Sequence, residues 1–323
     1  MSQNTHRLGW IGMGRMGTPM AELLLKAGHD VSLWNRTKSK AQPLADKGAK
    51  LVDTPADLGD VDIIFTMVST GKDLKQVYFG ENGVASGGKG KVPKIFVDCS
   101  SIGVEDSEEI RGKLKELGAD YLAVPVSGNG KCVKAGKLST VASGSKAAFE
   151  TVKPYIDTFA KAGTSYVGEG ELARICKIAH NVMLGVVIQN LIEITILAEK
   201  HGVPRHAFLD FMNNSVMGST FTRYKSNALV NLDWTTTFTP ELLRKDLDLG
   251  LAAGRKYNVP MPSTAATREA LQNHFGVATL QADPEHYLGL DFAALLETHA
   301  LASGVKLESE GVPVPTGLEV EGK

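Results

Sequence analysis

A lysine and an asparagine four residues apart have types and a spacing that suit acid–base chemistry. Lys177 and Asn181 lie in a long run without proline, where residues i and i+4 project from one face of a helix. A lysine inside a mostly apolar helix is unfavourable unless it is paired or takes part in chemistry. Its ammonium group can exchange a proton with a substrate oxygen, and a neighbouring amide can orient either partner. The pair is therefore a candidate for acid–base catalysis, and the alternative is a lysine near the helix start that extends its ammonium group to solvent. His180 lies on a different face and is predicted to be structural.

A glycine-rich turn near the start of the chain predicts a dinucleotide site. It follows a short apolar segment and precedes a run with helical spacing, and its residues are Gly12, Met13, Gly14, Arg15, Met16 and Gly17. In this context the first glycine permits the tight turn, the second lets a pyrophosphate approach the backbone, and the third lets helix and strand pack. The N–H groups of the helix N-terminus then face the phosphates. The alternative, a turn that binds nothing, is disfavoured by the strand–turn–helix context.

The end of the next strand-like segment distinguishes two forms of the dinucleotide. Asn35, Arg36 and Thr37 stand there, where an acidic residue would bind the ribose 2′-hydroxyl of NAD. An arginine instead offers a planar fork that suits a 2′-phosphate. We therefore expect NADP rather than NAD, and the alternative is that Arg36 is an exposed loop residue without a ligand.

Two serine-containing turns follow later strands. Ser127 and Gly128 lie at the expected carboxyl edge of the sheet, where ligands bind in open α/β folds, so the hydroxyl and nearby N–H groups could hold a carboxylate. Ser100 and Ser101 follow another strand, and they either face the ligand or cap the helix that starts near Gly103.

Alternating strand-like and helical segments in the first half must position these residues. The strand-like segments are 7–11, 30–34, 61–68 and 94–98, and the helical segments are 16–27, 39–47 and 103–117. The strands are apolar without strict alternation, which is typical of a parallel sheet covered on both faces. The pattern predicts an α/β fold with a doubly wound Rossmann parallel sheet.

The second half is predicted to be an all-α domain built on one long interdomain helix. Residues 172–200 lack proline, and their apolar positions go nearly all the way round the helix. The few helices predicted after it are too small a bundle to cover this helix within one chain. We therefore expect a homodimer or homotetramer. Further helices are expected at 205–213, 241–257, 264–275 and 292–301. The predicted divisions are a dinucleotide-binding domain 1–168, a substrate and dimerisation domain 169–303, and a tail 304–323 without assigned function.

Composition excludes several other classes of protein. The formal net charge of −1 gives no strong field for nucleic acid or an anionic membrane, so neither is expected as a partner. Cys99, Cys132 and Cys176 lie far apart, which predicts neither a disulfide framework nor a metal site. The chain begins without an apolar leader, and polar residues interrupt its longest apolar run. We therefore expect a cytoplasmic protein.

Five segments carry motifs in a characteristic order: GWIGMGRMGTPMAELLLKAGHDVSLWNRT (9–37), VDCSSI (97–102), VPVSGNGKCVKAGKL (124–138), KIAHN (177–181) and FTPELLRKDLDLGL (238–251). Together they resemble the β-hydroxyacid dehydrogenase family, which includes 3-hydroxyisobutyrate dehydrogenases and glyoxylate/succinic semialdehyde reductases. The resemblance implies an NADP-dependent enzyme that transfers a hydride between nicotinamide and a small β-hydroxy (or α-hydroxy) carboxylic acid or its semialdehyde.

The resemblance also implies roles for individual residues. Lys177 would be the general acid/base, and Asn181 would orient it or the substrate. Cofactor contacts are implied for Gly12, Met13, Gly14, Arg15, Met16, Gly17, Asn35, Arg36, Thr37, Val68, Ser69, Ser101 and Lys245. Substrate contacts are implied for Ser101, Ser127, Gly128, Asn129 and Lys177. Asp246 is expected to orient that site or balance a charge, and Arg174 and Cys176 are expected to be structural.

Two departures from the family pattern concern the substrate. Asn129 replaces the usual second glycine, and Ala123 and Val124 stand where an aspartate is common. Asn129 could narrow the pocket or hydrogen-bond a polar substituent.

Three alternatives remain open. An imine reductase could use the same scaffold, but such relatives typically replace the lysine that this chain keeps. A 6-phosphogluconate dehydrogenase has a similar Lys-x-x-His-Asn run but a much longer helical domain. A non-catalytic binding module that kept the fold is disfavoured by the intact pair of Lys177 and Asn181.

Overall fold

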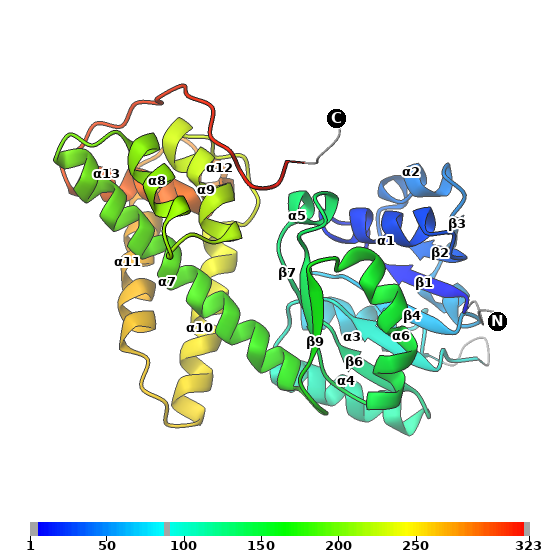
Figure 1. Cartoon of the computed structure of the whole chain (residues 1–323). Coiled ribbons are helices and arrows are strands. Elements are labelled where there is room, and N and C mark those ends of the chain that lie inside the picture. The colour runs from blue at the N-terminus through cyan, green and yellow to red at the C-terminus, as the bar shows by residue number, and fades with distance from the viewer. Residues whose placement is uncertain (1–5, 87–90, 320–323) are drawn as a thin grey trace. The chain divides into compact units, whose positions relative to one another are not determined.

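The computed structural model describes residues 6–86 and 91–319 (Figure 1). The chain's own contacts divide it into two compact units, Met1–Lys177 and Ile178–Lys323. The division falls inside helix α7 (Leu172–Lys200), so this helix begins in the first unit and continues in the second. The boundary expected from the sequence, at residue 168, lies just before the helix.

The first unit is built on a six-stranded parallel sheet of order β3-β2-β1-β4-β5-β6. The strands are β1 (Leu8–Ile11), β2 (Val31–Trp34), β3 (Lys50–Leu51), β4 (Ile63–Thr66), β5 (Ile95–Asp98) and β6 (Asp120–Ala123). The register places Ile11 beside Trp34 and Thr66, so the carboxyl ends of β1, β2 and β4 meet at one edge. The strand order reverses between β1 and β4, and such a switch point opens a ligand crevice. The predicted doubly wound fold is confirmed.

Helices cover both faces of this sheet, which explains the apolar strands. On β4, Ile63 and Phe65 join the core on one face and Ile64 joins the core on the other. The first core includes residues of α1 (Gly17–Lys26) and α6 (Lys146–Phe159), and the second includes residues of α3 (Gly71–Phe79) and α4 (Val104–Glu116). Because side chains on both faces of each strand are buried, no polar–apolar alternation develops.

A second, three-stranded sheet was not expected from the sequence. Its strands are β7 (Val126–Ser127), β8 (Ser139–Ala142) and β9 (Gly163–Tyr166), and β7 is antiparallel to β8 whereas β9 is parallel to it. The strands are short and partly exposed, so they lack an apolar signature. A bridge between Ala123 and Ser143 joins this sheet to the end of β6. Helix α5 (Gly130–Lys134) follows β7 directly.

The second unit is helical, as predicted. Its elements after α7 are α8 (Arg205–Asn214), α9 (Thr220–Asn231), α10 (Pro240–Lys256), α11 (Pro262–Ala278), α12 (Pro284–Gly289), the 3-10 turn Phe292–Ala294 and α13 (Leu295–Ala302). Two of these, α9 and α12, were not expected, because α9 is rich in polar residues and α12 is only six residues long. The helix expected at 39–47 is also shorter: a 3-10 turn, Lys38–Lys40, precedes α2 (Gln42–Ala45), which has proline in its first turn.

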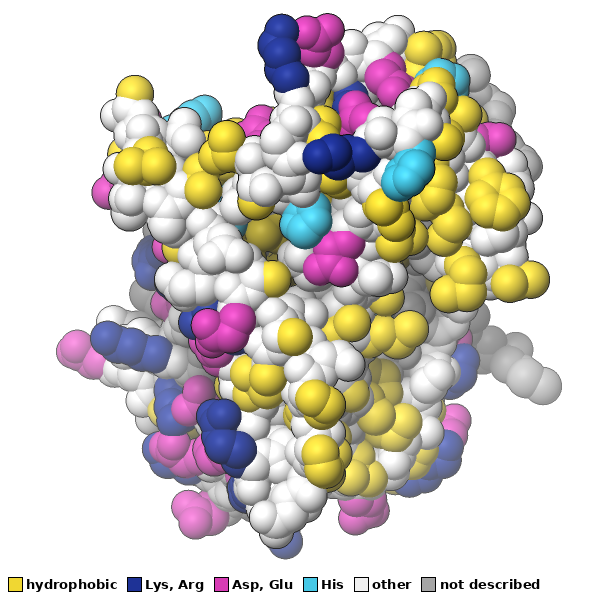
Figure 2. All heavy atoms as spheres, turned by 90° about the vertical axis from the view of Figure 1, so that its left-hand side faces the viewer, with side chains coloured by type: hydrophobic (Ala, Val, Ile, Leu, Met, Phe, Trp, Pro, Cys, Tyr) yellow, Lys and Arg dark blue, Asp and Glu magenta, His cyan; other side chains and the backbone are white. Residues whose placement is uncertain are grey.

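Helix α7 is only partly covered within one chain. Ile188, Leu191 and Ile192 lie in the core of the helical unit, whereas Met183 is 68% exposed and Leu197 is 59% exposed. By length and composition this helix could cross a membrane, but half of its most apolar stretch is buried, as in the central helix of a helical core. Figure 2 shows hydrophobic side chains gathered in patches on the face that it displays.

Residues 304–319 of the C-terminal tail lack helix and strand, and they hydrogen-bond to the helical unit. The buried guanidinium of Arg205 donates to the carbonyl oxygen of Glu308, and the carboxylate of Glu310 accepts the N–H of Arg205 at 2.7 Å. Further along, Asn231 donates to the carbonyl oxygen of Val312 at 2.8 Å. The tail side chains Val305, Leu307, Val312 and Val314 also pack on the helical core.

Candidate active site

The glycine turn after β1 fits a dinucleotide. Gly12 has φ +100°, and a Cβ there would lie 2.1 Å from the carbonyl oxygen of Met67. A Cβ on Gly17 would lie 1.9 Å from the carbonyl oxygen of Gly12. These two glycines are therefore required by the protein's own backbone. A Cβ on Gly14 would meet nothing within 4 Å, so this side of the turn has the open space that an approaching pyrophosphate needs.

Asn35 braces this turn from the end of β2. Its Oδ1 accepts the backbone N–H of Met13 at 2.8 Å, and its Nδ2 donates to the carbonyl oxygen of Thr37 at 2.7 Å. The neutral carboxamide thus occupies the position where an acidic residue would bind ribose hydroxyls. The side chain of Met13 is buried in the first core, so only its backbone faces the turn.

The cations that follow β2 are exposed and paired. The side chain of Arg36 is 86% exposed, and its guanidinium lies 3.6 Å from the carboxylate of Asp73. Asp73 also accepts the hydroxyl of Thr70 at 2.7 Å at the start of α3. Lys38 pairs with Asp53. Exposed pairs of this kind contribute only about 0–1 kcal/mol, so a bound phosphate can replace the carboxylate beside Arg36.

The turn after β5 is tied to the turn after β4. The buried Ser100 accepts the N–H of Val68 through its Oγ at 2.9 Å, and its own N–H donates to Oδ1 of Asp98 at 3.1 Å. Ser101 is partly exposed, so it is the serine that can face a ligand. Helix α4 has Gly103 as its N-cap and no side-chain cap, so the capping alternative for the two serines does not hold.

The turn after β7 lies beside the glycine turn. Gly128 is exposed with φ +129°, a conformation that favours glycine. A Cβ on Gly130 would lie 2.9 Å from the carbonyl oxygen of Arg15. The first unit therefore brings the predicted substrate turn, with Ser127 at the end of β7, next to the predicted pyrophosphate site.

Asn129 takes a specific role in this turn. It is the N-cap of α5, and its Oδ1 accepts the N–H groups of Lys131 at 2.9 Å and Cys132 at 3.1 Å. These contacts fix the direction of the carboxamide. Its Nδ2 is shielded from solvent and has no hydrogen-bond partner among the described residues. A buried donor without a partner costs about 1–3 kcal/mol, which an acceptor on a ligand would recover.

The acid–base pair lies on α7. The partly buried Lys177 is the last residue of the first unit, and Asn181 follows one helical turn later in the second unit. Within the second unit, Asn181 donates to Asp246 at 2.6 Å, and Nδ1 of His180 lies 2.8 Å from Oδ1 of Asn181. Lys245 lies 3.3 Å from Asp246. Asp246 therefore orients Asn181, and His180, predicted to be structural, does so as well.

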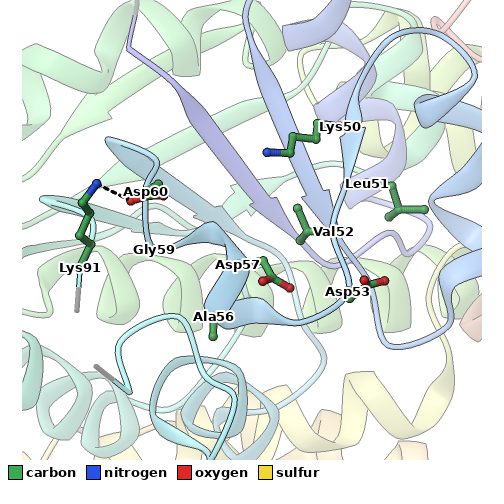
Figure 3. Close-up of a pocket in the computed structure, with 9 residues that line it drawn as sticks. All are labelled: Lys50, Leu51, Val52, Asp53, Ala56, Asp57, Gly59, Asp60 and Lys91. Carbon is green, nitrogen blue, oxygen red and sulfur yellow. Dashed lines mark ion pairs between the residues drawn. The ribbon is translucent and has the colours of Figure 1, made fainter. Parts of the chain in front are cut away.

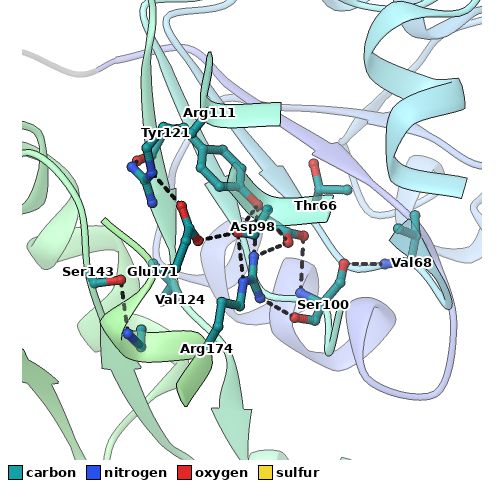
Figure 4. Close-up of polar contacts among 12 residues, drawn as sticks. Thr66, Val68, Asp98, Ser100, Arg111, Tyr121, Val124, Ser143, Glu171 and Arg174 are labelled. Carbon is teal, nitrogen blue, oxygen red and sulfur yellow. Dashed lines mark hydrogen bonds and ion pairs between the residues drawn. The ribbon is translucent and has the colours of Figure 1, made fainter. Parts of the chain in front are cut away.

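A buried polar cluster in the first unit was not recognised from the sequence (Figure 4). Its members are Asp98, Ser100, Ser107, Arg111, Tyr121, Glu171 and Arg174. Burial raises the pKa of the Tyr121 hydroxyl, so this group is neutral. Arg111 donates to Glu171 at 2.5 Å, and Glu171 accepts the hydroxyl of Ser107. The sequence signal for this cluster was Arg174, an arginine within an apolar helix, three residues before Lys177.

One cavity of about 340 Å³ is lined by residues of β3 and of the segment that follows it (Figure 3). Its lining includes Lys50, Asp53, Asp57 and the ion pair between Lys91 and Asp60 at 2.8 Å. None of the predicted site residues lines it.

The first unit thus brings together most of the predicted contacts at one edge of its sheet. They are Gly12, Gly14, Gly17, Asn35, Val68, Ser101, Ser127, Gly128 and Asn129. A parallel sheet with such a turn at its switch point, followed by a helix that carries a lysine and an asparagine, is typical of a dinucleotide-dependent oxidoreductase.

Comparisons with known proteins specify the class further. Residues 7–168 match the model of the NAD binding domain of 6-phosphogluconate dehydrogenase. Residues 171–290 match the model of the NAD-binding domain of NADP-dependent 3-hydroxyisobutyrate dehydrogenase. The chain belongs to the β-hydroxyacid dehydrogenase family, and it is a dehydrogenase or reductase that acts on CH–OH groups.

Similar proteins include two named reductases. The chain is 31% identical over 269 residues to glyoxylate/succinic semialdehyde reductase 2 of Arabidopsis thaliana, covering 82% of this chain and 74% of that protein. It is 31% identical over 302 residues to 2-hydroxy-3-oxopropionate reductase of Escherichia coli, covering 92% and 100%. A crystal structure of 3-hydroxyisobutyrate dehydrogenase from Salmonella typhimurium shares the fold, with a TM-score of 0.77 and 24% identity over 90% of this chain and 99% of that one.

Proposed function

We propose that the protein is an NADP-dependent reductase of a small aldehyde or ketone that carries a carboxylate, and that it also oxidises the corresponding β- or α-hydroxy acid. The observation that carries this proposal is the pair of Lys177 and Asn181 on α7, with Asn181 held by Asp246. The two named reductases among its relatives support a carbonyl substrate of this kind.

The residues divide the work as follows. The bound nicotinamide supplies or accepts the hydride. Lys177 donates a proton to the carbonyl oxygen during reduction and takes it back during oxidation, a role that typically contributes about 10²–10⁴-fold to the rate. Asn181 orients the lysine or the substrate. Ser127 and Gly128 hold the carboxylate, and Asn129 adds a hydrogen bond through the Nδ2 that lacks a partner among the described residues.

The preference for NADP is part of this proposal. The family model for residues 171–290 describes an NADP-dependent enzyme, and Arg36 follows β2 where an NAD enzyme has an acidic residue. Arg36, Thr37 and Ser69 are exposed and available to a 2′-phosphate or the adenosine. Arg15, Met16 and Lys245 complete the proposed cofactor contacts.

We propose that the protein works in the cytoplasm as a homodimer or homotetramer. Its partner is a small-molecule carboxylate substrate, and nucleic acid and membranes are not expected as partners. The exposed apolar residues of α7 support the assembly. In this proposal residues 1–168 bind the dinucleotide, residues 169–303 serve the substrate and the assembly, and residues 304–323 form a tail.

Consumption of NADPH with a panel of carbonyl compounds tests the proposal. The panel contains glyoxylate, succinic semialdehyde, a neutral aldehyde of similar size and a cyclic imine. We expect turnover to be highest with a carboxylate-bearing aldehyde. Turnover of the imine alone would identify an imine reductase, and binding of NADPH without turnover of any compound would identify a non-catalytic module.

A further inference from the structure

Arg174 makes more hydrogen bonds to residues near the strand ends than the packing of α7 alone would require. It lies on α7 three residues before Lys177 and is 1% exposed. Its Nη1 donates to the carbonyl oxygen of Ser100 at 2.5 Å, and its Nε donates to Oγ of Ser107 at 3.1 Å. Its Nη2 donates to the carboxylate of Asp98 and to the hydroxyl of Tyr121 at 2.8 Å (Figure 4).

Ser100, whose carbonyl oxygen accepts a hydrogen bond from Arg174, lies at the ligand-binding edge of the sheet. Ser100 accepts the N–H of Val68 at 2.9 Å and donates its own N–H to Asp98 at 3.1 Å. Arg174, in the first turn of α7 that leads to Lys177, thus contacts the turn after β5 with Ser101 directly. It is linked to the turn after β4 through Ser100, which accepts the N–H of Val68. Each of these segments carries a residue of the proposed site.

Stability alone does not explain an arginine here. A buried ion pair is often replaceable by apolar residues without loss of stability, because desolvation of both charges offsets their attraction. The planar guanidinium differs from an apolar side chain by fixing the direction of several acceptors at once. The arrangement thus constrains where α7 begins relative to the turn that holds Ser100.

We propose that Arg174 is a positioning residue, which sets the place of Lys177 relative to Ser101 and to the cofactor-binding edge. The inference rests on the proposed role of Lys177. Displacement of a reacting group by about 1 Å can lower a rate by about 10²-fold, so loss of the guanidinium fork is expected to lower the rate of the chemical step in the folded protein.

The chain offers a matched control on the same end of α7. Oγ of Ser143 accepts the N–H of Ala173 at 3.0 Å and donates to the carbonyl oxygen of Gly170 at 2.8 Å. Ser143 therefore anchors the helix start without a contact to Ser100. Ser143→Ala removes such an anchor, whereas Arg174→Lys keeps the charge and removes the fork.

The experiment measures kcat, the KM for NADPH, thermal stability and the primary isotope effect on kcat with NADPH deuterated at the transferred position. For Arg174→Lys we expect kcat to fall roughly 10–100-fold, with an increased isotope effect and a KM for NADPH within about threefold of the wild type. For Ser143→Ala we expect lower thermal stability, with kcat and isotope effect unchanged within about twofold. A variant that is merely less folded lowers the apparent kcat without changing its isotope effect.

Two further variants keep the inference falsifiable. If Arg174→Lys does not fold, Tyr121→Phe removes one partner of the guanidinium and keeps the ring, and a kcat and isotope effect equal to those of the wild type overturn the inference. An inactive Lys177→Ala variant combined with fully active Arg174→Lys overturns the inference and leaves the proposed function standing. A fully active Lys177→Ala variant overturns both.

Discussion

At the scale of single residues, the pair of Arg36 and Asp73 bears on the choice of dinucleotide. In the protein alone the guanidinium lies 3.6 Å from the carboxylate, and both side chains are accessible. A 2′-phosphate placed beside Arg36 would compete with Asp73 for the same cation. The proposed preference for NADP should therefore be weakened by loss of Arg36 and strengthened by loss of the charge of Asp73.

Arg36→Ala should raise the KM for NADPH roughly tenfold to a hundredfold and leave the KM for NADH almost unchanged, because a charge-assisted hydrogen bond contributes about 1.5–3 kcal/mol. Asp73→Asn is the matched variant, since it keeps the position of the hydrogen bond to Thr70 and removes the competing charge. It should lower the KM for NADPH about two- to fivefold, as expected for an exposed pair. Equal losses with both cofactors in Arg36→Ala, measured by steady-state kinetics, would contradict this account.

Asn129 is the second residue whose substitution is expected to change the KM of one kind of ligand, here the carboxylate-bearing substrate. Asn129→Asp keeps an oxygen to cap α5 but replaces the donor Nδ2 with a negatively charged acceptor. We expect the KM for carboxylate-bearing aldehydes to rise about tenfold or more, while the KM for a neutral aldehyde changes little. The ratio of the two KM values is the measurement, and the same ratio in variant and wild type would show that Asn129 only caps the helix.

At the scale of elements, the sequence predicts α7 and the apolar strands β1, β2, β4 and β5, but it does not predict α3, α6 or β6, nor several short or polar elements. Helix α7 has the predicted bounds because its proline-free apolar run is too long for a strand. The strands β7 and β9 were not predicted because they lack an apolar pattern, and α9 was not predicted because it is rich in polar residues. The glycine turn could be predicted because its motif is local. The cluster around Arg174 could not, since it joins residues from β5, α4, β6 and α7 that only the fold brings together.

Helix α11 carries a buried histidine that should make stability depend on pH. His274 stacks on Tyr287, its Nδ1 lies 2.8 Å from the hydroxyl of Thr298, and burial lowers its pKa to about 4 from the ordinary 6.5. Between these values the unfolded chain binds more protons, so this histidine's contribution to stability is complete above pH 6.5 and declines as the pH falls towards 4. Acidification from pH 7 to pH 4.5 should cost roughly 2–3 kcal/mol through this residue.

Denaturant unfolding of the wild type and of His274→Gln over this pH range measures the effect. Glutamine keeps a polar partner for Thr298 but does not titrate. The free energy of unfolding should fall more steeply with acid in the wild type than in the variant. Parallel curves would exclude His274 as the source of the pH dependence.

At the scale of the whole molecule, the uncovered apolar side chains of α7 are expected to lie in an interface between chains. Met183 and Leu197 are more than half exposed in a single chain. Light scattering at micromolar concentration should give a mass of at least twice 34.5 kDa for the wild type. Leu197→Lys should weaken the assembly, because a charge would then be buried without a partner, whereas Lys200→Ala on the same helix should not. A stable wild-type monomer would contradict the expectation.

The central claim is that Lys177 acts on the substrate oxygen, and the turnover of Lys177→Ala tests it most directly. The variant is assayed with NADPH and the best carbonyl substrate, and NADPH binding is titrated in parallel. We predict that turnover falls by about 10²–10⁴-fold while the Kd for NADPH stays within about threefold of the wild type. Turnover above a tenth of the wild-type value, with intact cofactor binding, would contradict the account.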